Sequence, residues 1–209
     1  VLSYLLFNFN TKNKTEAEVI KEIGANLGGI SSYVDVFRKH KSEECEVKFI
    51  VRAKNLVEKA GDLSKILDET TLNVDFEDKD ALYNVLLEIK LMLESRFKNS
   101  GHAFIARRIS GFYNPQSKLA SYHGEYDFYE FISELVNKYE QNSDKIKEKL
   151  YTVTNLIFNQ ARLLVNFVGN KEEYTNFKET ISSYLTKYPS ELNKQSGFEI
   201  KLEEQGYSE

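Results

Sequence analysis

The centre of the chain is residues 96–124, RFKNSGHAFIARRISGFYNPQSKLASYHG, and this stretch decides the fold. It follows a strongly apolar segment and precedes an aromatic one. It holds two of the three histidines, His102 and His123, the pair Arg107 and Arg108, and the first of only two prolines. The stretch is predicted to be a helical linker between two half-units of one α+β domain.

The residues before this linker alternate between helical and strand patterns. Thr15 and Glu18 have the spacing of a capping box, which predicts a helix beginning there. The helix is expected to end at Gly28-Gly29, because glycine accepts the left-handed conformation of a helix C-cap. Residues 30–37 are then a predicted strand.

A second strand is predicted over residues 44–53, where apolar and mostly charged residues alternate. The apolar set consists of Cys45, Val47, Phe49, Val51 and Ala53. Such alternation gives a strand one buried face and one solvated face, as antiparallel sheets allow.

Helical patterns dominate the rest of the chain, with apolar residues at three- and four-residue steps. The predicted helices cover residues 56–67, 78–98, 100–113, 126–139, 144–158 and 170–188. Leu163, Val165 and Phe167 alternate instead, which predicts one more strand over residues 161–169. Pro189 is expected to end the last helix.

These elements predict an α+β fold, an antiparallel sheet with helices packed on one face. A chain of 209 residues can bury a core as one domain. We expect a single domain over residues 1–209, with a first part (1–95), the helical linker (96–124), a second part (125–189) and the start of an interdomain connection (190–209). The chain begins inside an apolar helix, VLSYLLF, without an initiator methionine, so a fragment of a longer protein is expected.

Composition narrows the class of partner. The net charge is −4 and the charges are interspersed, which is not the footprint of a nucleic-acid-binding protein. No apolar run approaches the roughly 20 residues of a membrane helix. The single cysteine, Cys45, excludes an internal disulfide and favours a reducing compartment. Neither nucleic acid nor membrane is therefore a predicted partner.

The residues that could carry chemistry do not form a catalytic pattern. His40, His102 and His123 never occur at the spacing that places two imidazoles on one helical face, so no metal site is predicted. His102 and His123 could still meet in space across the linker. Cys45 alternates with core residues and is predicted to be an inert buried thiol. Gly28-Gly29 lacks the third glycine of a phosphate loop and is taken as a helix stop.

Two groups of charges leave alternatives open. The acidic residues within 75–80 surround a predicted helix start, where carboxylates offset the helix dipole. Calcium binding or acid–base chemistry is the alternative, although the spacing is not that of an EF-hand loop. Arg107 and Arg108 could bind a substrate carboxylate, or they could form structural salt bridges with Glu88 or Glu94. Taken alone, these residues support no catalytic mechanism.

Two stretches resemble one protein family. In the linker the matching features are Ser100-Gly101-His102, Ala106-Arg107-Arg108 and the aromatic run after Gly124. Residues 5–35 add a helix, a turn, a second helix, a Gly-Gly stop and a strand in the family's order. Together they resemble the presequence-protease branch of the pitrilysin-type metallopeptidases, which includes falcilysin and bacterial insulinase-like zinc peptidases. The resemblance covers almost the whole chain.

The resemblance implies an architecture and a division of labour. Members have four similar α+β units in two halves around a closed chamber. The first unit holds zinc through an inverted H-x-x-E-H and a distal glutamate, and the last supplies an arginine and a tyrosine. This chain resembles the third unit. Ser3 and Tyr4 lie where a zinc-bearing unit has its glutamate and second histidine, which implies that the metal site has been lost.

The function implied is that of a non-catalytic domain of a zinc-dependent metalloendopeptidase that degrades unstructured peptides. The domain would contribute chamber wall and the closure of the two halves. Its expected partners are the other domains of the same chain and unstructured peptides, in a reducing cytoplasm or an organelle matrix. Alone, it is expected to hold no cofactor and no catalytic residue and to be inactive.

Two competing hypotheses remain. One is a stand-alone interaction or assembly protein of the same fold, and the other is an enzyme that uses His102, His123 and the arginines. The family-motif residues predicted to be substrate-facing or structural are Gly101, His102, Arg107, Arg108, His123 and Gly124.

Overall fold

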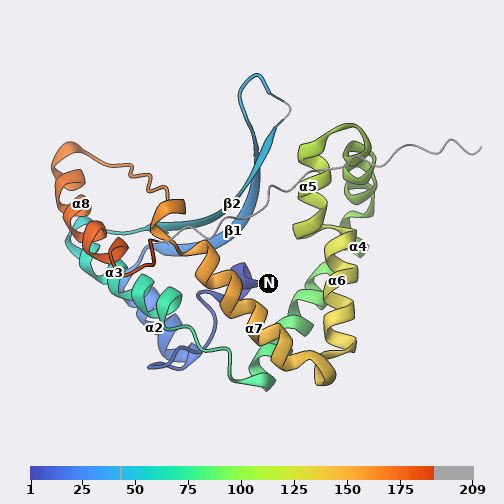
Figure 1. The fold of residues 1–209 in the computed structure, drawn as a ribbon, viewed down its shortest axis with the longest axis horizontal. Helices are drawn as coiled ribbons and strands as arrows, with labels where there is room; N and C mark the ends of the chain where they lie inside the picture. Colours follow the sequence, from blue (N-terminus) through green and yellow to red (C-terminus); the bar gives the residue numbers. More distant parts are fainter. Residues whose placement is uncertain (43, 191–209) are drawn as a thin grey trace, which may run out of the picture. The chain divides into compact units, whose positions relative to one another are not determined.

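The computed structural model describes residues 1–42 and 44–190 and confirms the α+β fold (Figure 1). Strands β1 (Gly29–Arg38) and β2 (Cys45–Lys54) form a two-stranded antiparallel sheet. The chain divides into two compact units. In the described part, unit 1 comprises residues 1–33, 51–82 and 143–190, and unit 2 comprises residues 34–50 and 83–142.

Unit 1 is built from helices around an apolar core. Its helical elements are α1 (Leu2–Leu5), α2 (Glu16–Asn26), η1 (Val57–Lys59), α3 (Ala60–Leu67), the π-helical turn η2 (Asp68–Leu72), most of α7 (Tyr139–Ile157), η3 (Gln160–Arg162) and α8 (Lys171–Leu185). Helix α3 packs against both α2 and α8. The fully buried Leu5, Phe9 and Phe76 belong to the core of this unit.

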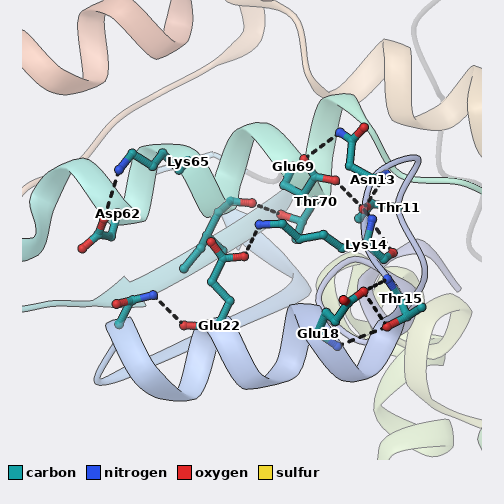
Figure 2. Close-up of polar contacts among 12 residues, drawn as sticks. Thr11, Asn13, Lys14, Thr15, Glu18, Glu22, Asp62, Lys65, Glu69 and Thr70 are labelled. Carbon is teal, nitrogen blue, oxygen red and sulfur yellow. Dashed lines mark hydrogen bonds and ion pairs between the residues drawn. The ribbon is translucent and has the colours of Figure 1, made fainter.

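Two predicted helix starts of unit 1 are confirmed, whereas the helix predicted over residues 56–67 begins later, as α3 at Ala60, and the helix predicted over residues 144–158 begins earlier, as α7 at Tyr139. The Thr15 and Glu18 side chains form the expected capping box at α2 (Figure 2), and Asn170 with Glu173 forms a second one at α8. Each box satisfies backbone N–H groups that have no partner within the helix. Helix α8 ends at Leu185, before Pro189.

Glu69 ties the loop that precedes α2 to η2 (Figure 2). Its carboxylate accepts hydrogen bonds from the Thr11 hydroxyl and, at 3.1 Å, from the Asn13 side-chain amide. Thr11 and Asn13 are 58 and 56 residues away in the chain, so the link is tertiary.

Unit 2 contains most of α4 (Lys79–Tyr113), then α5 (Pro115–Gly124) and α6 (Tyr126–Asn137). Helix α4 is kinked at Ser100, whose φ of −141° and ψ of 35° are not helical, so the two separate helices predicted on either side of residue 99 are in effect present. Asn114 caps α5 by accepting from the Gln116 N–H at 2.9 Å, and Pro115 occupies the first turn, where its missing N–H costs nothing.

The strand predicted over residues 161–169 is wrong for the described part of the chain. Residues 160–162 form η3, and the segment that follows has no strand partner among the described residues. Phe167 stacks on Phe177 of α8 with ring centroids 4.8 Å apart, whereas Leu164 is 86% exposed. The residues do alternate, but no strand in residues 1–42 or 44–190 pairs with them.

Three finer predictions also need correction. The alternating face of β2 is not uniformly buried, because Val47 is 54% exposed and Cys45 is only half-buried. The apolar residues of α6, which three- and four-residue steps predict to be buried, include Phe131, which is exposed. Helix α2 ends at Asn26, and Gly29, with φ of +144°, opens β1 rather than capping the helix. The connection predicted over residues 190–209 lies outside the described residues, except for Ser190.

Candidate functional site: a groove between α4, α5 and α6

A groove of about 690 Å³ lies in unit 2, between the second half of α4, α5 and the start of α6. We call it the α4–α6 groove. Its apolar lining is mostly aromatic and consists of Phe97, Phe104, Ile105, Phe112 and Tyr126. Its polar lining consists of Arg107, Arg108, Lys118, Ser121, Glu125 and Asp127.

The aromatic wall forms where the α4 kink brings two segments together. Phe97, before the kink, lies 4.2 Å from Phe104, after it, measured between ring centroids. Phe97 also meets Tyr129 of α6 edge to face at 5.3 Å. Aromatic pairs in such orientations add to the stability gained from burial.

Arg108 and Asp127 form the outer charged pair of the groove. The Arg108 Nη1 atom is 3.5 Å from Asp127 Oδ1, and its guanidinium lies over the Tyr126 ring at 5.7 Å. The Ser121 hydroxyl lies 2.8 Å from Asp127 Oδ2 and 2.8 Å from the Lys118 carbonyl oxygen, so its proton is shared between these two acceptors. The Asp127 carboxylate is therefore both paired and hydrogen-bonded.

Arg107 and Glu125 form the inner pair, and its geometry is poorer. Arg107 Nε lies 3.8 Å from Glu125 Oε1, beyond hydrogen-bonding distance, although only 8% of the Glu125 side chain is exposed. Burial raises the pKa of Glu125 above its ordinary value, and the nearby Asp127 charge adds to this, while Arg107 and Arg96 oppose it. A carboxylate so perturbed in a groove is a candidate for function.

The salt-bridge partners that the sequence suggested for the arginines are wrong. Arg107 and Arg108 pair with Glu125 and Asp127, not with Glu88 or Glu94. Glu94 instead accepts a hydrogen bond from the Tyr129 hydroxyl at 3.1 Å. Both true partners lie beyond α5, so spacing along α4 could not identify them.

Of the six family-motif residues, the structure brings Gly101, Arg107 and Arg108 to the groove. His102 is exposed on α4. His123 lies on α5 with its Nε2 atom buried and without a hydrogen-bond partner among the described residues, and burial lowers its pKa. No atom of another part of the described chain crowds the position a Cβ would take at Gly101 or Gly124.

Glu125 is the residue that the sequence argument missed. It lies between two helices, directly after Gly124, where an acidic residue is expected to be exposed. The only local signal is the Glu-Tyr-Asp triplet 125–127, which opens α6 and sets acidic residues near a helix N-terminus.

The described residues offer neither a metal-binding cluster nor a membrane-spanning helix. No group of three or more His, Cys, Asp or Glu side chains in residues 1–42 and 44–190 is arranged to hold a metal ion. None of the described helices combines the length and the apolar character that crossing a membrane requires.

Comparison with known proteins shows where this chain belongs. The model of the family described as peptidase M16, subfamily C, associated matches residues 1–135. The chain is 25% identical over 188 residues to protein HypA of Clostridium perfringens (strain 13 / Type A), covering 90% of this chain and 19% of that protein. It is also 25% identical over 185 residues to presequence protease 1, chloroplastic/mitochondrial, of Arabidopsis thaliana, covering 88% of this chain and 17% of that protein.

The chain thus spans less than a fifth of the length of either relative. The family model covers well over half of the chain, including β1, β2, all of α4 and α5, and nearly all of α6. The family resemblance predicted from residues 5–35 and from the linker is confirmed. This chain belongs to the family of domains associated with the subfamily C peptidases of family M16.

Proposed function

We propose that this chain is a non-catalytic domain of a zinc-dependent metalloendopeptidase that degrades unstructured peptides in a closed chamber. The observation that carries the proposal is the family match over residues 1–135. A relative named as a presequence protease supports it. In this proposal the domain supplies chamber wall and helps to close the two halves of the enzyme.

Zinc does not fit the residues at the start of the described chain. Ser3 and Tyr4, which the resemblance places where a zinc-bearing unit has its glutamate and second histidine, lie on α1, and the Ser3 carbonyl accepts a hydrogen bond from the Ser32 hydroxyl at 2.9 Å. Serine and tyrosine do not supply the nitrogen and carboxylate ligands of a catalytic zinc site. We therefore assign zinc, and the peptide-bond chemistry, to another domain of the proposed enzyme.

The structure supports a role in contacting peptides through the α4–α6 groove. Clefts of roughly 300–1,000 Å³ with apolar walls and a few convergent polar groups are typical ligand sites. The groove has both properties. The partners proposed are peptides in an unfolded state and the other domains of the same polypeptide, in a reducing compartment.

The test compares the full-length protein with a version that lacks residues 1–209. We expect the truncated protein to keep its zinc, measured by metal analysis, and to lose hydrolysis of a fluorogenic peptide. Full hydrolysis without these residues would overturn the proposal. The 209-residue chain alone, assayed with and without zinc, is expected to be inactive.

The competing function is a stand-alone interaction or assembly protein of the same fold. It predicts that the full-length reading frame contains no H-x-x-E-H sequence. Sequencing that reading frame on both sides of residues 1–209 separates the two functions.

A further inference from the structure

Among the polar groups that line the α4–α6 groove, Glu125 is a buried residue whose carboxylate receives no hydrogen bond from the described chain. The residue is 6% exposed, and the nearest cation that the structure places on it is Arg107, at 3.8 Å. No described residue donates a hydrogen bond to either carboxylate oxygen of Glu125. Burial of the charged Glu125 side chain is unfavourable, because its carboxylate gives up hydrogen bonds to water and gains no hydrogen bond from the described chain in return.

The nearby Asp127 shows that this deficit is not a general property of the groove. Asp127 is more exposed, accepts from Ser121 at 2.8 Å and lies 3.5 Å from Arg108. The two acidic side chains of the groove therefore differ in their burial and in their hydrogen bonding. Asp127 is satisfied within the protein, whereas Glu125 has capacity for a further donor.

The walls of the groove suit a long side chain with a cationic end. Phe97, Phe104 and Tyr126 supply apolar and aromatic surface beside Glu125. Tyr126 already carries the Arg108 guanidinium over its face at 5.7 Å, so this wall accepts such a group. Lysine and arginine bury their alkyl stems along apolar surface while their charged ends seek a polar partner.

The charges that line the groove do not by themselves decide which side chain binds there, because Arg107, Arg108 and Lys118 are among them. The solvation of each charged group decides it. Arg107 and Arg108 are 54% and 57% exposed, and an ion pair with a solvated side chain gains little. A donor that reaches the carboxylate of the largely buried Glu125, which lacks a hydrogen bond from the described chain, gains more, since it replaces hydrogen bonds to water that burial reduces.

We propose that the α4–α6 groove binds a basic side chain, lysine or arginine, of an extended peptide, and that Glu125 receives its cationic group. The proposal rests on the proposed function, because it names the kind of peptide segment that the domain contacts. Arg107 competes with the ligand for Glu125 and turns toward solvent when the ligand binds.

The first test is calorimetric titration of the 209-residue chain with capped pentapeptides, acetyl-Leu-Leu-X-Leu-Leu-amide. The central residue X is arginine, lysine, citrulline, norleucine or glutamate. We expect the arginine and lysine peptides to bind at least about tenfold more tightly than the citrulline and norleucine peptides, as charge-assisted hydrogen bonds predict. Equal affinity for arginine and citrulline, tightest binding of the glutamate peptide, or no binding of any peptide overturns the proposal.

Variants locate the site. Glu125→Gln keeps the shape of the side chain and should reduce the affinity for the arginine peptide to that for citrulline. Glu140→Gln, an exposed carboxylate on α7, is the matched control and should change nothing. Arg107→Gln should increase the affinity for the arginine peptide, because it removes the competing cation. If the groove bound an anionic ligand instead, the same substitution would weaken binding. A Glu125→Gln protein that is folded and still prefers arginine over citrulline also overturns the proposal.

These outcomes are independent of the test of the proposed function. The domain-removal experiment reads hydrolysis in the full-length protein, and the titrations read the side-chain preference of one groove. A negative titration therefore rejects the groove assignment and leaves the peptidase assignment standing.

Discussion

The Arg107 Nε atom lies 3.8 Å from Glu125 Oε1, and this pair joins the second half of α4 to the start of α6. The distance is too long for a hydrogen bond, so Arg107 compensates the buried charge only in part. Burial is therefore the largest effect on the pKa of Glu125 and raises it above its ordinary 4.5. The Asp127 charge adds to this increase, whereas Arg107 and Arg96 oppose it.

This pair predicts a pH-dependent stability. The folded chain holds the Glu125 proton more tightly than the unfolded chain, so its contribution is fully present below pH 4.5 and is lost as the pH rises through the raised pKa. Glu125→Gln should remove that slope and raise the unfolding free energy at pH 7 by about 1 kcal/mol. Urea unfolding between pH 4 and 7 measures both, with Glu140→Gln as the control. An unchanged slope in Glu125→Gln would contradict the assignment.

His123 predicts a slope of the opposite sign. Burial lowers its pKa below 6.5, and the Asp35 charge only partly opposes this. The unfolded chain then binds the proton more tightly, so stability is present above pH 6.5 and is lost as the pH falls through the lowered pKa.

The His123 ring signals in an NMR titration should report a midpoint below the ordinary histidine value of 6.5. His123→Phe should abolish this part of the pH dependence. A His123 midpoint at or above 6.5 would show that burial does not dominate.

A buried hydroxyl cluster ties the end of α8 to η2. The Thr71 hydroxyl lies 3.2 Å from the Tyr184 hydroxyl and donates to the Leu67 carbonyl at 2.6 Å, and it also contacts the Tyr188 hydroxyl. Thr71→Val should lower the unfolding free energy by about 1–3 kcal/mol, because it leaves buried partners unsatisfied. Thr175→Val, whose exposed hydroxyl also bonds a carbonyl four residues earlier, should change it by less than about 0.5 kcal/mol. Equal effects at the two sites would refute the cluster's role.

The Glu69 anchor in unit 1 should matter for acid stability. Burial favours the neutral carboxyl, but hydrogen bonds from Thr11 and Asn13 outweigh it and lower the pKa of Glu69 below 4.5. Its stabilisation is therefore present above pH 4.5 and is lost as the pH falls through the lowered pKa. Glu69→Ala should cost about 1–2 kcal/mol at pH 7 by denaturant unfolding.

The control for this anchor is Asp62→Ala, which removes an ion pair with Lys65 at the surface (Figure 2). That change should cost less than about 0.5 kcal/mol. If the two substitutions were equally harmful, Glu69 would hold no special place in the loop.

Local signals predicted much of the fold. The caps at Thr15 and Asn170 depend on side chains within three residues of one another, so sequence spacing is sufficient to identify them. The kink at Ser100 was visible as a change of pattern between two helical segments. The strand predicted over residues 161–169 failed for the described chain because a strand requires a partner, and alternation does not show where one lies.

The residues of the candidate site were likewise predicted only in part from the sequence. Gly101, Arg107 and Arg108 were singled out because they occur in a family motif, and they do line the groove. Glu125 was missed because its burial arises only when α4, α5 and α6 come together.

Most of the helices, the first two strands, the caps at Thr15 and Asn170 and the family were determined by the sequence itself, because they depend on residue types a few positions apart. Tertiary structure alone decided that Arg107 meets Glu125, that Glu125 becomes buried, and that it lines an aromatic groove. Solvation is a property of the space around a group, and that space is built from segments that no short stretch of sequence contains.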